Sequence, residues 1–226
     1  MPMSDLGAID WFPVVLSLRV AFLATLSAAL AGVPLAYGLA RRRLPAPRLL
    51  SALTTLPLVL PPTVVGYYLL LLIGRQGPLG RLLEGMGIRL VFTWHAAVLA
   101  AAVVSFPLVV RSAQAAFESM DPALEAAART LGRSELSIFF TVTAPLAWRG
   151  ILAGAVLAFA RAMGEFGATL MVAGNIPGRT QTLSVAIYDA VQSGQYGLAN
   201  ALVLLISLVS VGVLVVLTGF GEGRGR

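Results

Sequence analysis

Two ionisable residues, Arg161 and Glu165, interrupt an otherwise apolar stretch of this chain. Their spacing of four residues places both on one face of a helix, about 20–30 Å along it from Leu146. Ionisable residues inside a membrane-spanning helix usually serve a function. Arg161 could attract an anion at an entrance through charge-assisted bonds, with Glu165 setting its orientation. In the alternative interpretation, the two charges neutralise each other near an interface and hold helices together.

A second set of candidate residues consists of hydroxyl side chains around a cluster of prolines. Thr54, Thr55 and Thr63 lie in the stretch 54–66, which also contains three prolines. Proline inside a helix removes a backbone hydrogen bond and kinks the helix. Membranes tolerate such breaks where the freed carbonyls are buried in protein or face a wet cavity. These hydroxyls and the loosened backbone could line a solute pathway, or the break could be a kink that serves packing alone.

The composition excludes most other chemistry. The chain has no cysteine and a single histidine, His95, so it offers neither a thiolate metal site nor a set of histidine ligands. A membrane enzyme would need a nucleophile with its base, or metal ligands at one depth, and these are missing. The chain has no lysine either, so the phosphate-binding Gly-x-x-x-x-Gly-Lys motif cannot exist. We therefore expect no cofactor and no catalysis, and ATP hydrolysis would have to reside on a partner.

Hydropathy indicates an integral membrane protein. Hydrophobic residues make up 58% of the chain and charged residues only 12%, whereas soluble domains carry roughly a quarter charged residues. A spanning helix needs about 20 apolar residues, and we expect an all-α chain forming one transmembrane domain over residues 1–226. Five stretches qualify as spans: Phe12–Ala40, Leu49–Ile73, Val91–Phe117, Leu146–Ala168 and Leu198–Phe220. The second span should break near its middle, where the prolines lie. Thr180–Gln192 is too short and polar for a sixth span, so we expect it to form a short helix at the outer surface.

The distribution of arginine predicts the orientation. All 16 basic residues are arginine, and they lie at segment ends rather than on one soluble face, which speaks against nucleic acid as a partner. With five spans, the more basic side is the cytoplasmic one, and this places the N-terminus outside and the C-terminus inside. That side would hold Arg41, Arg42, Arg43, Arg48, Arg111, Arg129, Arg133, Arg149, Arg224 and Arg226. The other side would hold Arg75, Arg81, Arg89 and Arg179.

Residues 118–145 form a polar interruption between two of the spans. Asp121 followed by proline is a good helix start, and Gly132 fits the position just past a helix end. Ser134 could cap a second helix over Glu135–Val142, which Pro145 would end or kink. Leu136, Phe139 and Phe140 give this second helix an apolar stripe. Such a hairpin either lies on the bilayer surface or inserts its apolar side chains into a socket on a soluble protein.

The hairpin resembles the cytoplasmic signature of the membrane permease subunits of ATP-binding-cassette importers. That signature reads Glu-Ala-Ala, three residues, Gly, nine residues, Ile-x-Leu-Pro. The matching positions in this chain are Ala127, Ala128, Gly132 and Pro145, with the family's acid displaced by one residue to Glu125. In the family this loop seats in a cleft of the ATP-hydrolysing subunit. The resemblance therefore implies a coupling role for these five residues, to which we add Phe139 of the apolar stripe.

The resemblance extends over about residues 14–195 and indicates oxyanion importers. The stretches 56–80, 101–112 and 159–183 are similar to molybdate importer permeases, whereas sulfate and thiosulfate permeases share Ala-Arg-Ala-x-Gly-Glu and the Gly-Asn-Ile-Pro-Gly turn. The family implies a type I importer fold in a bacterial inner membrane. It also implies two ATP-binding subunits and a periplasmic or surface oxyanion-binding protein. Molybdate is the expected substrate, with tungstate or sulfate as alternatives.

Five helices are few for enclosing a path with two alternating openings, so we expect a symmetric homodimer with the route along its two-fold axis. An ion-gradient transporter is the main rival within membrane transport. It would need no capped hairpin, and proton relays usually contain more buried acids than Glu165 alone. A scaffold without transport activity is the remaining alternative, and it would move no solute under any condition.

Overall fold

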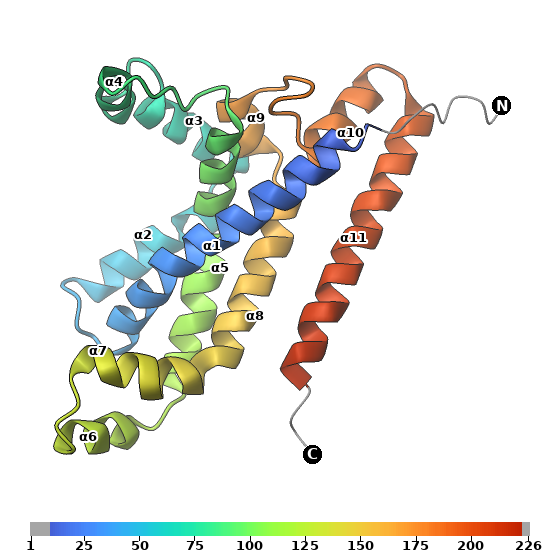
Figure 1. The fold of residues 1–226 in the computed structure, drawn as a ribbon. Coiled ribbons are helices and arrows are strands. Elements are labelled where there is room, and N and C mark those ends of the chain that lie inside the picture. Colours follow the sequence, from blue (N-terminus) through green and yellow to red (C-terminus); the bar gives the residue numbers. More distant parts are fainter. Residues whose placement is uncertain (1–9, 223–226) are drawn as a thin grey trace.

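The structure is a computed structural model that describes residues 10–222 of the 226-residue chain. Within that range every regular element is a helix (Figure 1), which confirms the all-α prediction. Arg224 and Arg226, which the orientation argument uses, lie outside the described residues. In chain order the helices are α1 (Phe12–Ala40), α2 (Pro47–Val59), α3 (Pro62–Ile73), α4 (Pro78–Gly85), α5 (Trp94–Glu118), α6 (Pro122–Thr130), α7 (Glu135–Ile138), the π-helical segment η2 (Phe139–Thr143), α8 (Ala144–Met163), α9 (Gly167–Ala173), α10 (Leu183–Gln192) and α11 (Tyr196–Glu222).

Within residues 10–222, four helical segments are long and apolar enough to cross a membrane, or five if a bent pair of helices counts as one span. The four are α1, α5, the continuous helix Glu135–Met163 and the Tyr196–Val215 part of α11. The pair is α2 and α3, which meet at an angle of 115°. The short helix expected over Thr180–Gln192 is α10, which begins at Leu183.

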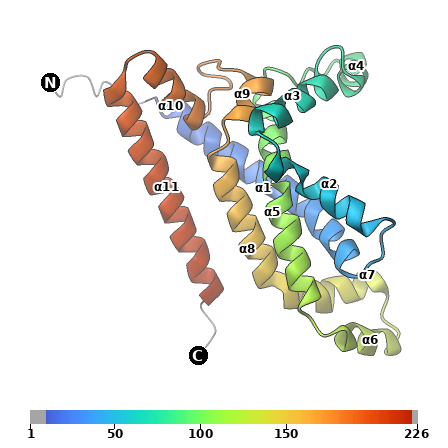
Figure 2. The same ribbon diagram turned by 180° about the vertical axis from the view of Figure 1, so that it is seen from behind.

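The stretch predicted as the second span is broken where the prolines lie. Leu60 leaves the helical conformation, and α3 starts again at Pro62. Pro61 and Pro62 have no backbone N–H, so neither can continue the hydrogen-bond ladder of α2. Leu49–Ile73 is therefore two helices at a sharp angle rather than one kinked span, and Figure 2 shows α3 leading away towards α4.

The segment predicted as the fourth span differs from the expectation at both ends. Pro145 does not end the hairpin helix, because α7, η2 and α8 form one continuous helix from Glu135 to Met163. The helix widens just before the proline, where the Ala144 N–H donates to the Phe139 carbonyl five residues earlier. At the other end α8 stops at Met163, and Gly164–Phe166 separate it from α9. Small residues in an apolar run give no clear signal of such a break.

Small side chains allow the central helices to approach closely. Helix α1 packs against α5 and α8, and α5 packs against α8. Ala21 and Ala24 of α1 and Ala97, Ala100 and Ala101 of α5 are completely buried. A β-carbon at Gly154 of α8 would lie 2.8 Å from the Ser112 Cβ of α5. Membrane helices associate through such small-residue contacts, because apolar area alone gains little in lipid.

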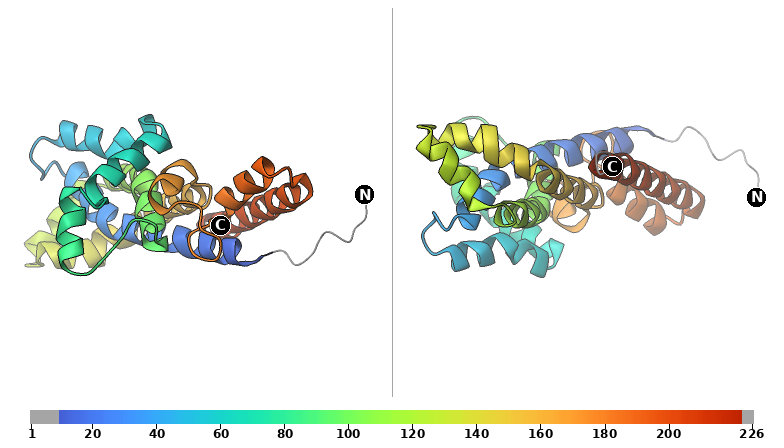
Figure 3. Two further views of the ribbon diagram at one scale, coloured as in Figure 1. Left: turned by 90° about the horizontal axis from the view of Figure 1, so that it is seen from above. Right: turned by 90° about the horizontal axis from the view of Figure 1, so that it is seen from below.

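The helices give the described molecule two distinct ends. Helices α6 and α7 and the loop after α1 lie together at what we call the hairpin end (Figure 1). Helices α4, α9 and α10 lie at the opposite end, here called the far end. Figure 3 shows α10 and α11 on one side of the central helices and α2 to α4 on the other. A displacement of α6 and α7 can therefore reach the far end only through the long central helices.

Candidate functional site

Local capping shapes the α6–α7 hairpin. The Asp121 carboxylate accepts a hydrogen bond of 2.9 Å from the Ala123 N–H at the start of α6. Gly132 has a φ of +76°, a left-handed conformation that reverses the chain after α6 at little steric cost. The Ser134 hydroxyl then accepts from the Ser137 N–H at 3.3 Å. These caps and the turn between them make the hairpin a regular helix–turn–helix unit rather than an irregular loop.

Glu125 on α6 is a buried carboxylate held by three other side chains. Only 2% of its side chain is exposed. Arg41, directly after α1, donates from Nη2 at 2.8 Å and from Nε at 3.1 and 3.2 Å to the two carboxylate oxygens. The Thr143 hydroxyl donates at 3.1 Å, and Arg129 Nη2 donates at 3.3 Å. The acid of the predicted coupling set thus faces the interior of this chain, and not a partner.

The pKa of Glu125 reflects a balance between burial and these donors. Burial disfavours the charged form and acts to raise the pKa. The hydrogen bonds and positive charge of Arg41, with further bonds from Thr143 and Arg129, outweigh this and lower the pKa below its ordinary value. Glu125 is therefore ionised at neutral pH, and the Arg41 guanidinium can bind its carboxylate through two parallel hydrogen bonds.

Glu135 on α7 is the second acid in the same network. Arg129 Nε and Arg43 Nη2 each donate to it at 2.6 Å. These bonds, first that of Arg129 and then that of Arg43, lower the pKa of Glu135 to about 2. The bond to Glu135 likewise raises the pKa of Arg129. Two arginines that directly follow α1 therefore hold one acid on each helix of the hairpin.

The hairpin also carries exposed apolar side chains. Leu131 and Phe140 expose 81% and 65% of their surface. We call the exposed apolar side chains of the hairpin the apolar face, and they are Leu124, Leu131, Leu136 and Phe140. Of the predicted coupling residues, Ala127 and Pro145 are also exposed, whereas Ala128 is buried.

Phe139 does not belong to this apolar face. Its ring lies 5.2 Å from the ring of Tyr37 on α1 and 6.2 Å from that of Phe117 on α5. Phe139 is half-buried and Phe140 is exposed, so Phe140 presents more of its ring to a partner, and the contact of Phe139 with a partner stays a prediction. Phe139 also joins the hairpin to the central helices.

The hydroxyls predicted to line a pathway on α2 have local partners. Thr54 and Thr55 donate to the Ser51 carbonyl at 2.9 and 2.7 Å. The Thr55 hydroxyl also accepts a bond of 2.8 Å from Arg111 Nη2 on α5. Thr55 therefore presents an arginine-bound hydroxyl, and Arg111 ties α5 to α2.

Thr63 lies where the two broken segments of the chain meet. A β-carbon at Gly167, the first residue of α9, would lie 3.1 Å from Thr63 Cγ2. Nearby, a β-carbon at Gly66 of α3 would lie 2.8 Å from Ala168 Cα of α9. The breaks after α2 and α8 thus let two short helices cross at close range.

The Arg161–Glu165 pair forms as predicted, but not on one continuous helix. Arg161 Nη1 lies 2.8 Å from Glu165 Oε2, and Glu165 sits in the break after α8. The other oxygen of Glu165 accepts a 2.8 Å bond from the Ala168 N–H at the start of α9. This geometry favours the structural interpretation, in which the acid neutralises Arg161 and orients α9. Arg161 keeps 31% of its side chain exposed, so its outer edge stays accessible.

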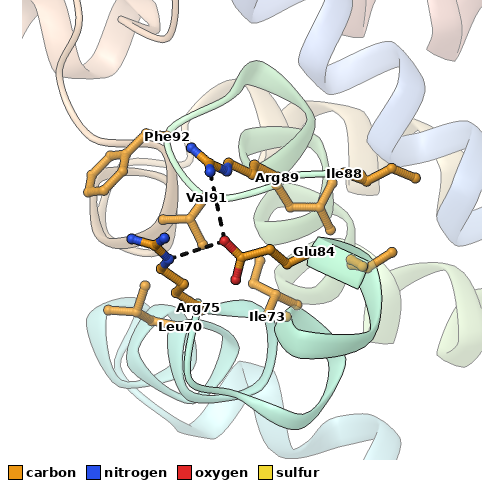
Figure 4. A pocket seen from close by; sticks show the side chains of 12 residues that line it. Leu70, Ile73, Arg75, Glu84, Ile88, Arg89, Val91 and Phe92 are labelled. Carbon is orange, nitrogen blue, oxygen red and sulfur yellow. Dashed lines mark hydrogen bonds and ion pairs between the residues drawn. The ribbon is translucent and has the colours of Figure 1, made fainter. Parts of the chain in front are cut away.

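A pocket of about 500 Å³ opens at the far end between α3, α4 and the chain leading into α5 (Figure 4). Its wall is mainly apolar, and Glu84 lies near its rim between two arginines. Arg75 Nε is 3.1 Å and Arg89 Nη2 is 3.8 Å from the same Glu84 oxygen. Two cations against one acid leave this rim basic.

Sequence reasoning missed the partners of Glu125. Arg41 and Arg43 were used only as orientation signals, although they follow α1 directly. Arg41 is 84 residues from Glu125, and no local pattern pairs residues at that distance. A buried acid on a short polar helix does, however, require a cationic partner, and the arginine run at the same end of the molecule was the available source.

Comparison with known proteins places this architecture in a family. Residues 30–222 match the family model described as binding-protein-dependent transport system inner membrane component. The chain belongs to this family. The resemblance inferred from the hairpin signature is thereby confirmed, and the chain is a membrane component of a transport system.

Curated relatives and solved structures agree with this assignment. The molybdenum transport system permease protein ModB of Escherichia coli (strain K12) is 47% identical, over 91% of both chains. ModB of Azotobacter vinelandii is 42% identical, over 92% of this chain and 93% of its own length. Sulfate permease 2, chloroplastic, of Chlamydomonas reinhardtii is 39% identical over 88% of this chain, which matches 54% of that protein.

Among solved structures, an inward-facing MetNI methionine ABC transporter matches with a TM-score of 0.72 and 18% identity, over 95% of both chains. An amino acid ABC transporter matches with a TM-score of 0.65 and 20% identity, over 98% of this chain and 99% of that chain. These matches confirm the type I importer fold.

Proposed function

We propose that this chain is the permease subunit of an ATP-driven importer that moves molybdate into the cytoplasm. The observation that carries the proposal is the 47% identity with ModB over 91% of both chains. Tungstate has the same tetrahedral shape and charge and would be a second substrate. Because the chain lacks the lysine of a phosphate-binding loop, the energy would come from separate ATP-binding subunits.

The hairpin would be the place where those subunits act. Its apolar face exposes Leu131 and Phe140, and ion pairs join the hairpin to the arginines that follow α1. An apolar patch that stays exposed beside a polar rim is typical of a docking surface. Two ATP-binding subunits would each take one hairpin of a symmetric dimer, with Ala127, Gly132 and Pro145 shaping the contact.

This assignment sets the orientation and the other partners. The hairpin end would face the cytoplasm, and the far end, with the start of α1, would face outwards, where an oxyanion-binding protein delivers its load. Two copies of the chain would enclose the route along their two-fold axis. We include Thr54, Thr55, Thr63, Arg161 and Glu165 as candidate pathway residues.

The transport cycle would need only two states. Closure of the ATP-binding subunits would bring the two hairpins together and favour the outward-open dimer, and hydrolysis would return it to the inward-facing form. A partly neutralised Arg161 would attract the oxyanion without holding it tightly. Weak binding suits this step, because the binding protein already supplies the affinity.

Uptake by proteoliposomes tests the proposal. The purified complex of this chain with its ATP-binding subunit and binding protein should take up radiolabelled molybdate only with ATP inside the vesicles. Omitting the ATP-binding subunit should abolish uptake. Uptake driven by an ion gradient without ATP would contradict the proposal and favour a secondary transporter.

Sulfate import is the second candidate, because the chloroplast sulfate permease is also 39% identical over most of this chain. The two functions separate in a competition measurement. Excess tungstate should suppress molybdate uptake, while excess sulfate should leave it nearly unchanged. The opposite pattern would assign the chain to sulfate.

A further inference from the structure

The covalent chain connects the hairpin to only two of the central helices. Helix α6 follows α5 through Ser119–Asp121, and α7 continues through η2 into α8. Helix α1, which runs along both of these helices, has no such connection to the hairpin. Any direct transmission of hairpin motion to α1 must therefore pass through side chains.

Two sets of side chains make this connection: the ring of Phe139 packs against Tyr37 of α1, and the ion-pair network joins α6 and α7 to the arginines after α1. Arg41 caps the C-terminal end of α1, and its own N–H bonds back to the Tyr37 carbonyl at 3.0 Å. Its guanidinium reaches across to Glu125 of α6, with only 13% of the side chain exposed. Arg43 is also fixed by its backbone, through a 2.9 Å bond to the Gly38 carbonyl, and reaches Glu135 of α7. Arg129 bonds to both acids and so closes the network.

Two features separate this network from an ordinary surface ion pair. Exposed pairs contribute little, because water and salt screen them, whereas Glu125 is almost fully buried and makes a forked bond with Arg41. The network also joins three separate parts of the fold, because Arg41 and Arg43 follow α1 while Glu125 lies on α6 and Glu135 on α7. Leu136 and Phe140 of the apolar face line a pocket with Arg43 and Glu135, so the docking surface adjoins the ion network.

We propose that Arg41 and Glu125, supported by Arg129, Glu135 and Arg43, are positioning residues that transmit movement of the hairpin to α1. This inference rests on the proposed function, since it describes how the driven hairpin moves the membrane helices. The network makes α6, α7 and the end of α1 move as one body. Without it, α1 would follow the hairpin only through Phe139 and through its packing on α5 and α8, and less molybdate would move for each ATP hydrolysed.

The test uses the complete reconstituted complex and measures molybdate transported per ATP hydrolysed. Glu125→Gln removes the charge but keeps the shape of the side chain. The amount of molybdate transported per ATP hydrolysed should fall by roughly 2- to 30-fold, which is the range of coupling effects for residues outside ligand sites. Arg41→Lys keeps the charge and loses the fork, and should give a smaller fall. Arg42→Gln is the matched control, because Arg42 is exposed and makes no side-chain bond within residues 10–222.

A covalent rescue distinguishes transmission from a merely structural role. The natural chain has no cysteine, so Arg43→Cys and Glu135→Cys can be joined selectively by a bifunctional thiol reagent in the Glu125→Gln background. Both positions are accessible, with side chains 40% and 50% exposed. The tether should restore the ratio of molybdate to ATP in the complex.

The outcomes separate cleanly. An unchanged ratio in Glu125→Gln and Arg41→Lys, or a low ratio that persists after complete tethering, would overturn the proposal. If Glu125→Gln fails to assemble, Arg41→Lys carries the test with the same criterion. Loss of ATP-dependent uptake in the unmodified complex would instead reject the proposed function itself.

Discussion

At the scale of single residues, Glu165 performs two structural tasks in the break between α8 and α9. One carboxylate oxygen pairs with Arg161 at 2.8 Å, and the other accepts from the Ala168 N–H at 2.8 Å. The side chain is 2% exposed, so its charge depends on these partners. Residue types alone predicted the pair, because acid and base four residues apart inside a membrane segment need each other. They could not predict the capping bond, which exists only because the helix ends at Met163.

Glu165→Gln should destabilise the protein. The variant leaves Arg161 without its acid and keeps only the capping bond. Because Arg161 is partly exposed, we expect a loss of about 1–3 kcal/mol in the free energy of unfolding, below that for breaking a fully buried pair. Thermal unfolding in detergent measures this, with Glu118→Gln at an exposed position as the control. Equal stability of the two variants would show that the pair is dispensable.

The hairpin ion pairs should make local order depend on pH. The pKa of Glu135 falls from an ordinary 4.5 to about 2 on folding, and that of Glu125 is also lowered. The folded state binds fewer protons than the unfolded state in this window, so the stabilisation is present above about pH 4.5 and is lost towards pH 2.

A spin label at Ala126→Cys on exposed α6 reports this change by its mobility. Mobility should rise between pH 4.5 and 2, the window that the pKa of Glu135 sets, and high salt should weaken the exposed pairs. The Glu135→Gln variant should show raised mobility already at neutral pH and a smaller rise on acidification. A label that becomes less mobile on acidification would contradict the assignment.

At the scale of helices, continuous apolar runs were predictable and breaks were only partly so. Residues 12–40 form one helix along their whole apolar run, even though Pro34 lies inside it. The break near Pro61 was predictable, because two successive prolines cannot donate backbone bonds. Pro145 carried the same signal yet sits near the start of α8, where the missing N–H is tolerated after a π-helical turn. The break at Gly164 followed no sequence signal, because a glycine in a helix costs only about 1 kcal/mol.

The crossing of α3 and α9 should be sensitive to volume. Gly66→Leu would place side-chain atoms where a β-carbon already lies 2.8 Å from Ala168 Cα and 3.0 Å from its carbonyl oxygen. We expect a loss of about 1–3 kcal/mol in the free energy of unfolding, or displacement of α9. Gly212→Leu on α11 is the control, because no atom lies within 4 Å of its built β-carbon. Equal thermal stability of the two variants would contradict the close crossing.

At the scale of the whole molecule, the protein is a set of apolar helices with the α6–α7 hairpin at one end. The capping residues and the family signature predicted the hairpin, because both are local sequence patterns. The ion pairs that attach the hairpin to the end of α1 were not predictable, since Arg41 and Glu125 are 84 residues apart and meet only in the folded chain. The inward turn of Phe139 depends on the same tertiary context. Sequence therefore predicted where the hairpin lies, and the structure adds how it is held to the rest of the chain.

The most direct measurement of this account is cross-linking from the apolar face of the hairpin to the ATP-binding subunit. The chain has no native cysteine, so Leu131→Cys and Phe140→Cys each introduce a single thiol for a photoactivatable reagent. Both should cross-link to the ATP-binding subunit in membranes, and the yield should change when ATP is bound. Leu157→Cys on α8, which is 49% exposed, should not cross-link to it. If neither hairpin position reaches that subunit while the complex still imports molybdate with ATP, the hairpin is not the part of the molecule that is driven.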